Sequence, residues 1–278
     1  MMANFVGGIC TSHNGALMHG WDKQLRDDPI WTPLFEAYDP VKQWILDKKV
    51  DVLFFVFNDH VSNFFFDCYP TFAIGIAEEY EHADEGSGPR DLATPYGDVP
   101  FSRYMADYLI RDEFDLTVCQ EMKLDHGLMG PTPFMCDQPW PVKFLPFCVN
   151  VIQHPIPSVK RCWNLGKSIR TAIEAYPEDI NVAIVGTGGL SHELQGTGFG
   201  RIELDWDNEF MDKFEHEPES MLDWDVQEFM DRGGSESAET VMWFAMRGAM
   251  APKVKRIHRN LYRGMLTGMA MLVFEDDV

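Results

Sequence analysis

Four histidines in this chain occupy the same kind of position, at or shortly after an apolar stretch. His13 lies in "CTSHNGA", His60 in "VFNDHVS", His126 in "KLDHGLMG" and His192 in "VGTGGLSHELQG". A single histidine after a strand is usually a surface or hydrogen-bonded residue. The carboxyl ends of parallel strands, however, meet at one edge of a sheet, so we expect these four imidazoles to line one crevice. We interpret the other five histidines as structural: His19, His82, His154, His216 and His258.

A carboxylate inside an apolar helical pattern is the second unusual feature. The segment "GGSESAETVMWFAMRGAM" predicts a helix with Ser235 as its N-cap, and Glu239 falls at the edge of the apolar stripe. An ionised carboxylate there is unfavourable without a cation or a donor beside it. Glu239 is therefore either half of a buried salt bridge or a metal ligand, whereas Glu236 is typical of an exposed acid in a first turn. Two imidazoles and one carboxylate form the facial triad that holds non-haem Fe(II).

Other chemistries fit the spacing less well. The histidines form no short ligand pair and no H-E-x-x-H, which argues against a zinc site. The pair Gly186 and Gly188 could begin a dinucleotide-binding loop, but the third glycine position holds Ser191 and three further glycines would break the helix. There is also no G-x-S-x-G nucleophile motif. We therefore expect neither NAD binding nor serine hydrolase chemistry.

The elements that must carry these side chains alternate along the chain. We predict strands at Asn4–Ile9, Val52–Phe57, Leu116–Cys119, Phe144–Ile152, Val182–Val185 and Met269–Phe274. Helical patterns follow Asp39, which we expect to be an N-cap before Pro40, and occur around Phe101, after Ser158 and over Ala238–Ala249. This alternation favours an α/β fold: one domain over residues 1–278, with a mixed or mostly parallel central sheet flanked by helices.

One long polar segment interrupts this alternation. Residues Glu81 to Pro100, "EHADEGSGPRDLATPYGDVP", are rich in turn formers. A loop of this length in a compact domain is often a binding loop or a lid. A solvated surface excursion would have the same composition, so the sequence leaves both interpretations open.

Composition narrows the class of protein and its partners. The chain has 278 residues, of which 45% are hydrophobic, enough for one large α/β domain. A formal net charge of -21 argues against nucleic acid and anionic membranes as partners, so a substrate anion would need a local basic group. The six scattered cysteines form no C-x-x-C, and the N-terminus does not resemble a signal peptide. We therefore expect a cytoplasmic protein with reduced thiols.

Several of these segments together resemble a known family. "SHNGA", "VFNDH", "ADEGSGPR", "DHG", "GTGGLSHELQG" and "GSESAETVMW" occur in the order found in type II, or LigB-like, extradiol ring-cleaving dioxygenases. Within that family they are most similar to the catalytic beta subunit of protocatechuate 4,5-dioxygenase. The resemblance runs from about Phe5 to Met271 and so covers nearly the whole chain.

The resemblance implies a role for each candidate residue. It implies Fe(II) held by His13, His60 and Glu239. It also implies that His192 is the catalytic acid/base and that His126 is a second catalytic histidine near the oxygen. We expect Asn58 and Asp59 to orient His60 or its loop, and Asn58 is also a candidate substrate contact. The implied activity is insertion of both atoms of O2 to open the ring of a protocatechuate- or gallate-type catecholic acid.

Two departures from the family pattern leave alternatives open. A polar Ser-Asn-Thr stretch before the last strand is replaced by "LYRGMLTGMAML", so the ring could instead be a hydroxypyridone or a catechol without a carboxylate. Arg263 in this segment could bind a substrate carboxylate or pair with Glu36 or Asp107, whereas Lys255 and Arg256 are typical of a solvated turn. A non-enzymatic binding protein is disfavoured, because all five site residues are present.

The second departure concerns partners. Enzymes of this family carry a small helical domain, either fused or as a separate subunit, and this chain contains no such segment. We therefore expect an aromatic diol and O2 as small-molecule partners, with either a small helical alpha-type subunit or a second copy of the chain covering an apolar surface.

Overall fold

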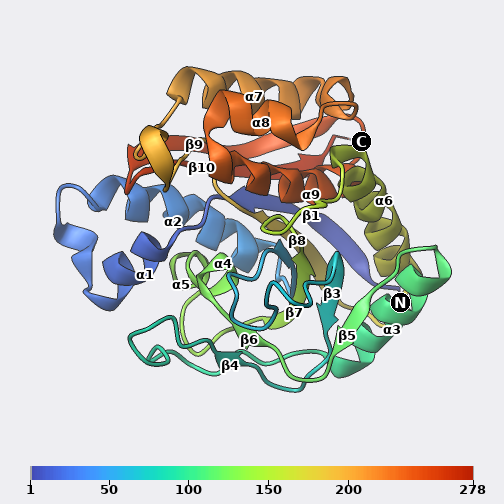
Figure 1. Ribbon diagram of the computed structural model, residues 1–278. Coiled ribbons are helices and arrows are strands. Elements are labelled where there is room, and N and C mark those ends of the chain that lie inside the picture. The colour runs from blue at the N-terminus through green and yellow to red at the C-terminus, as the bar shows by residue number, and fades with distance from the viewer. Residues whose placement is uncertain (1, 278) are drawn as a thin grey trace.

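A mixed eight-stranded sheet runs through the centre of the protein, in the order β5-β3-β7-β2-β8-β1-β10-β9 (Figure 1). The computed structural model describes residues 2–277. The four strands β7, β2, β8 and β1 are parallel neighbours, whereas β10 is antiparallel to both β1 and β9. Helices cover both faces of the sheet. The predicted single α/β domain with a mixed, mostly parallel sheet is confirmed.

The bounds of the elements are as follows. The strands are β1 (Asn4–Thr11), β2 (Val52–Phe57), β3 (Phe72–Gly75), β4 (Glu81–His82), β5 (Thr117–Cys119), β6 (Lys123–Leu124), β7 (Lys143–Val149), β8 (Asn181–Thr187), β9 (Val254–Gly264) and β10 (Thr267–Asp276). The α-helices are α1 (Gly15–Asp22), α2 (Thr32–Asp47), α3 (Val99–Arg111), α4 (His126–Met129), α5 (Thr132–Met135), α6 (Val159–Ala175), α7 (Leu204–His216), α8 (Val226–Gly233) and α9 (Trp243–Ala249). Short 3-10 helices are η1 (Leu25–Asp27), η2 (Gly196–Gly198), η3 (Pro218–Met221) and η4 (Ser235–Met242).

The central strand β2 shows why the sequence folds into this sheet. All six of its residues are buried, since β7 and β8 flank it and helices cover both faces. Successive side chains alternate between two cores. Val52, Phe54 and Val56 belong to the core on one face, which α3, α6, α7 and α9 complete. Leu53, Phe55 and Phe57 belong to the other core, under α2, α4 and α5.

Three local predictions are wrong. Helix α2 begins at Thr32, well before the predicted N-cap at Asp39, and Pro40 lies inside it, because the apolar face continues upstream through Leu34 and Tyr38. Ser235 is not an N-cap: Gly234, at φ 100°, precedes it and η4 begins there. Lys255 and Arg256 belong to the edge strand β9. The exposed and half-exposed residues of that strand give no apolar signal.

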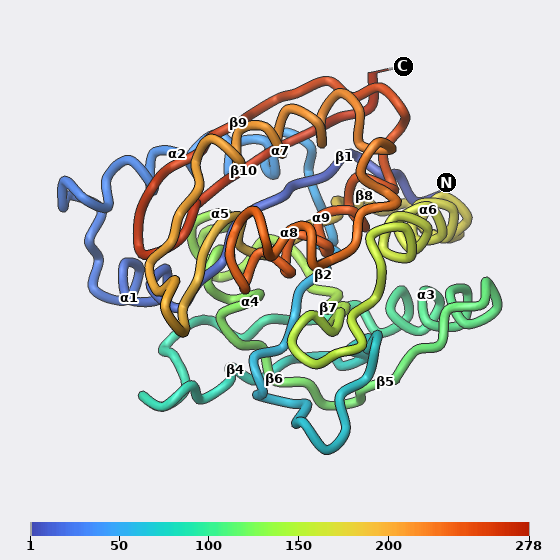
Figure 2. The backbone as a smooth tube through the Cα atoms, turned by 45° about the horizontal axis from the view of Figure 1, so that its top comes forward, coloured from blue at the N-terminus to red at the C-terminus, as the bar shows by residue number. Residues whose placement is uncertain are grey.

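A helix cap and the state of the cysteines agree with the sequence analysis. Ser158 caps α6 as predicted, accepting the backbone N–H of Arg161 at 3.2 Å. All six cysteines are free thiols, and four of them are buried. The β9–β10 hairpin passes between α2 and α7 (Figure 2). None of the helices formed by residues 2–277 combines the length and apolar character needed to cross a membrane.

Candidate active site

The structure brings the four strand-end histidines and Glu239 together. β1, β2 and β8 run parallel with their carboxyl ends at one edge of the sheet, and His13, His60 and His192 follow them. His126 is the first residue of α4 and Glu239 lies in η4. Nε2 of His13 and Nε2 of His60 lie 3.4 and 3.6 Å from Oε1 of Glu239, and Nε2 of His192 lies 3.8 Å from Oε2. Ligand nitrogens of His13, His60 and His126 lie within 4.8 Å of one another and could hold a metal ion.

Each of the four imidazoles uses its Nδ1 for a partner outside this cluster. The contacts are His13 with Thr187 Oγ1 at 3.1 Å, His60 with Asp125 Oδ2 at 3.2 Å, His126 with Glu85 Oε1, and His192 with the carbonyl of Leu190 at 3.1 Å. A carbonyl oxygen can only accept, so Nδ1 of His192 donates to Leu190, and the neutral ring then presents the lone pair of Nε2 to the cluster. Because each Nδ1 contacts a partner outside the cluster, Nε2 is the ring nitrogen that each histidine directs toward the cluster.

The segment "SHNGA" fixes His13 from both sides. The hydroxyl of Ser12 donates to the carbonyl of Gly268 and accepts the N–H of Ala270, which ties this segment to β10. Asn14 caps α1 by accepting the N–H of Leu17 at 3.1 Å. His13 therefore sits between a strand contact and a helix cap, which leaves its ring little freedom.

The polar cluster after β2 orders both the loop and the ring of His60, as predicted for Asn58 and Asp59. Asp59 accepts backbone N–H groups of the following residues up to Phe64 and so builds the turn. Asp125, which the sequence reasoning missed, accepts both the backbone N–H of His60 at 2.5 Å and its Nδ1. Asn58 does contact the ring, with Nδ2 3.1 Å from Nε2 of His60. A carboxylate immediately before His126 was the available signal for Asp125.

Glu239 is held by the glycines of "GTGGLSH". The backbone N–H of Gly189 donates to Oε2 of Glu239 at 2.7 Å, which leaves Oε1 directed toward His13 and His60. Gly188 has φ 134°, which favours glycine. A Cβ on Gly189 would lie 2.2 Å from the ring of His192. The glycines thus allow the acid and the imidazole to approach β8 closely.

The electrostatics of the cluster favour a bound cation. Burial by itself would raise the pKa of Glu239, but the neighbouring His13 and His60 hold it well below its usual value. Burial lowers the pKa of His13, so this ring is neutral at pH 7 and able to act as a ligand. Nε2 of His13 is buried without a hydrogen-bond partner among the described residues. An orphaned nitrogen beside an ionised carboxylate fits a shared metal ion.

A second carboxylate acts on His60. Burial alone would lower the pKa of His60, yet Asp125 and Glu239 outweigh it and raise that pKa to about 10 in the metal-free protein. Burial would likewise raise the pKa of Asp125, but His60 lowers it to about 2. Asp125 therefore stays ionised and fixes the orientation of the imidazole, as partners of metal-binding histidines do.

A cavity of about 380 Å³ opens beside the cluster and is lined by His60 and Glu239. Its other polar lining residues are His154, Gln195, Ser235 and Glu236. Two of these had been interpreted differently: His154 as structural and Glu236 as an exposed acid. Arg263 does not line this cavity. It is exposed on β9, opposite Gly268, and Asp107, one of its expected partners, pairs instead with Arg111.

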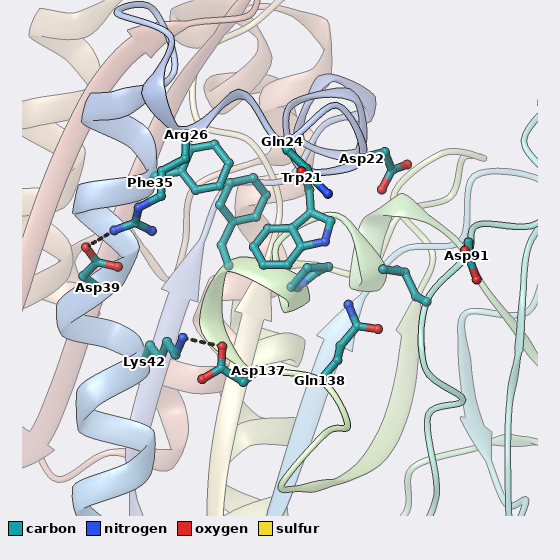
Figure 3. A pocket seen from close by; sticks show the side chains of 13 residues that line it. Trp21, Asp22, Gln24, Arg26, Phe35, Asp39, Lys42, Asp91, Asp137 and Gln138 are labelled. Atoms are coloured by element: carbon teal, nitrogen blue, oxygen red, sulfur yellow. Dashed lines mark hydrogen bonds and ion pairs between the residues drawn. The ribbon is translucent and has the colours of Figure 1, made fainter.

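A larger hollow of about 760 Å³ lies elsewhere, between α1, α2 and α5 (Figure 3). Trp21 and Phe35 contribute to its apolar wall, and the ion pairs Arg26–Asp39 and Lys42–Asp137 flank it. None of the predicted site residues lines it. Because two members of the titratable cluster, His60 and Glu239, line the smaller cavity, that cavity is the candidate active site.

Comparisons with known proteins agree with the observed fold. Residues 7–274 match the family described as "Catalytic LigB subunit of aromatic ring-opening dioxygenase". The chain is 41% identical over 196 residues to gallate dioxygenase of Pseudomonas putida KT2440. The aligned region covers 70% of this chain and 58% of that enzyme. It therefore spans less than two thirds of the length of that relative.

One further relative and one solved structure cover nearly the whole chain. A 2,3-dihydroxyphenylpropionate/2,3-dihydroxicinnamic acid 1,2-dioxygenase of Rhodococcus jostii is 24% identical over 305 residues, 92% of this chain and 93% of that enzyme. The crystal structure of an uncharacterized protein of Escherichia coli K12 has the same fold, with a TM-score of 0.54 at 11% identity, over 96% of this chain and 99% of that one. The family match over residues 7–274 decides the assignment: the chain belongs to the LigB family of catalytic subunits of aromatic ring-opening dioxygenases.

Proposed function

We propose that residues 1–278 form the catalytic domain of a cytoplasmic, non-haem Fe(II) extradiol dioxygenase. Its reaction inserts both atoms of O2 and opens the ring of a protocatechuate- or gallate-type catecholic acid. The observation that carries the proposal is the position of Glu239, whose Oε1 lies within 3.6 Å of Nε2 of both His13 and His60. Membership of the LigB family and the likeness to gallate dioxygenase support the same activity.

The ring geometry supports His13, His60 and Glu239 as the ligands. The rings of His13 and His60 are nearly perpendicular, at 83°, which suits two nitrogens that converge on one ion. His126 is also nearly perpendicular to His13, at 84°, but it is stacked on His60, with ring centroids 3.8 Å apart and an interplanar angle of 28°. Fe(II) bound by the triad would supply the open coordination positions and the redox chemistry through which O2 reacts with a catecholate.

The two remaining histidines have separate tasks in this proposal. In the neutral ring of His192, the lone pair of Nε2 lies beside Glu239, so it can accept a phenolic proton as the diol binds. The same nitrogen can later return that proton to an oxygen atom of the substrate as the ring opens. His126, on the other side of the cluster, can hydrogen-bond negative charge that develops on oxygen.

The cavity lining favours one second candidate, a ring without a carboxylate. The lining contains Glu236 and Glu239 and, within the part of the chain that the structure describes, neither lysine nor arginine. A substrate carboxylate in this cavity would therefore have the imidazole of His154 as a hydrogen-bond donor. A catechol or a hydroxypyridone without a negative substituent would need no such partner.

Oxygen consumption tests both candidates. The metal-free protein is loaded anaerobically with Fe(II) and mixed with gallate, protocatechuate, 2,3-dihydroxyphenylpropionate, pyrogallol, catechol and a hydroxypyridone. We expect one O2 consumed per ring opened with at least one diol, and none when Zn(II) replaces Fe(II). Stoichiometric iron binding without oxygen uptake on any of these rings would overturn the proposed activity.

A further inference from the structure

One side chain of the long polar loop reaches the histidine cluster. Oε2 of Glu85, in the loop after β4, accepts the backbone N–H of His126 at 2.9 Å. Oε1 of the same carboxylate contacts Nδ1 of the His126 ring. Both side chains are largely shielded from solvent, with exposed fractions of 21% for Glu85 and 16% for His126. The loop, expected from sequence to be either a lid or a surface excursion, thus contacts the candidate active site.

We propose that Glu85 is the positioning residue of His126, and this rests on the proposed function. A carboxylate beside Nδ1 accepts the proton of that nitrogen, so Nε2 is the atom that faces the cluster, and it can donate to a negatively charged oxygen when the ring carries a proton on both nitrogens. Helix α4 is only four residues long and cannot fix the ring by itself. Two contacts from one carboxylate, to the backbone and to the ring, define both the place and the rotation of the imidazole.

The loop is built to present this carboxylate. Oδ1 of Asp84 accepts the N–H groups of Gly86 and Gly88 at 2.9 and 2.8 Å, which closes a tight turn around Glu85. Gly86 and Gly88 have φ values of 101° and 84°, which favour glycine. The segment "ADEGSGPR" therefore encodes a preformed turn whose central acid points to His126.

Arg90 anchors the far side of the same turn. Its guanidinium donates to Asp22 at the end of α1, at 2.6 Å, and to the carbonyl of Met129 at the end of α4, at 2.7 Å. These contacts join the loop to two helices: α1, which follows His13, and α4, which begins with His126. The partner of His60, Asp125, belongs to a different element, so displacement of the loop would release His126 and leave the His60 contact in place.

The proposal makes Glu85 matter for turnover but not for metal binding. In Glu85→Ala and Glu85→Gln we expect unchanged iron content, a kcat lower by about 10- to 100-fold, and a KM within about threefold of wild type. Glu85→Gln, which retains an oxygen acceptor, should lose less than Glu85→Ala. The matched control is Glu81→Gln from the start of the same segment, because that side chain is 81% exposed and pairs with Lys123 at 3.9 Å.

A second readout is independent of activity. In the metal-free protein, ¹⁵N–¹H correlation spectra should show His126 protonated on Nδ1 in wild type and in Glu81→Gln, and shifted toward the Nε2 tautomer in Glu85→Ala. An unchanged tautomer, an unchanged kcat, or loss of iron in Glu85→Ala would each overturn the proposal. If wild type opens no ring, the proposed function fails and the tautomer measurement alone decides the role of Glu85.

Discussion

Oε1 of Glu239 lies 3.4 Å from Nε2 of His13, although the two residues come from opposite ends of the chain. The strand β1 carries His13 to the edge of the sheet, and the loop after β8 holds the carboxylate there through its second oxygen. The carboxylate oxygen is close to this nitrogen, which is buried and has no hydrogen-bond partner among residues 2–277. This single relationship makes the metal site testable.

Glu239→Ala should lose iron and activity together, because the carboxylate supplies the only negative charge of the proposed triad. The matched control is Glu236→Gln, which changes a carboxylate of the same 3-10 helix that lies outside the triad. We expect iron analysis after anaerobic loading to give a near-stoichiometric ratio for the control and almost none for Glu239→Ala. Full occupancy in Glu239→Ala would show that the ligand assignment is wrong.

His192→Ala should separate catalysis from metal binding. The ring contacts Glu239 only at 3.8 Å and is not part of the proposed triad, so iron content should remain that of wild type. Loss of the acid/base should lower kcat on the order of 10²- to 10⁴-fold. Iron analysis and oxygen uptake on the same sample measure both quantities. A variant that turns over normally, or that no longer holds iron, contradicts the assigned role.

Asp207 gives a pH dependence of stability. It is fully buried and accepts the N–H and the hydroxyl of Ser191, the residue before His192, at 2.9 and 2.7 Å. Burial raises the pKa of Asp207 to about 6, so the folded state favours the neutral acid. The stabilisation from this group is complete below the unfolded pKa of about 4 and is lost as pH rises through about 6.

The variant Asp207→Asn cannot ionise at this position, so its stability relative to wild type should increase as pH rises. We expect its free energy of unfolding, relative to wild type, to increase by about 2 kcal/mol between about pH 4 and pH 7. Urea unfolding of the two metal-free proteins at several pH values measures this difference. A difference that stays constant with pH, or that falls, would show that Asp207 is ionised throughout.

Substrate charge is tested by a pair of basic residues. Because His154 lines the cavity and Arg263 is exposed on β9, we expect His154→Gln to raise KM for gallate about tenfold or more, the loss of one charge-assisted contact. KM for pyrogallol, which lacks the carboxylate, should change little. Arg263→Met serves as the companion variant. If it alone affects gallate, the sequence-based assignment of Arg263 is right and that of His154 is wrong.

Assembly is the last prediction. Large apolar side chains are exposed, among them Leu194 at the cavity, which is 44% exposed, and Phe199, which is 62% exposed. We expect a small helical subunit or a second copy to cover such a surface. If a second copy covers the surface, light scattering of the chain alone should show a dimer or larger assembly. If a helical subunit covers it, addition of that subunit should increase the activity. A fully active monomer would remove both possibilities.

Local patterns in the sequence were sufficient for the central elements. The apolar run Val52–Phe57 predicted β2 with its observed bounds, because a strand buried on both faces is apolar at every position. His13, His60, His126 and His192 could be grouped because parallel strands end at one edge. Glu239 stood out because a carboxylate on an apolar stripe needs a partner.

The tertiary structure decided which carboxylate serves which imidazole. Asp59 is adjacent to His60 in sequence but builds a turn, whereas Asp125 and Glu85 reach His60 and His126 from other elements. Such pairs depend on how loops cross at the sheet edge, and no periodicity encodes that crossing. The same holds for His154 and Arg263: one was placed beside the cavity and the other on the exposed edge strand β9 by contacts distant in sequence.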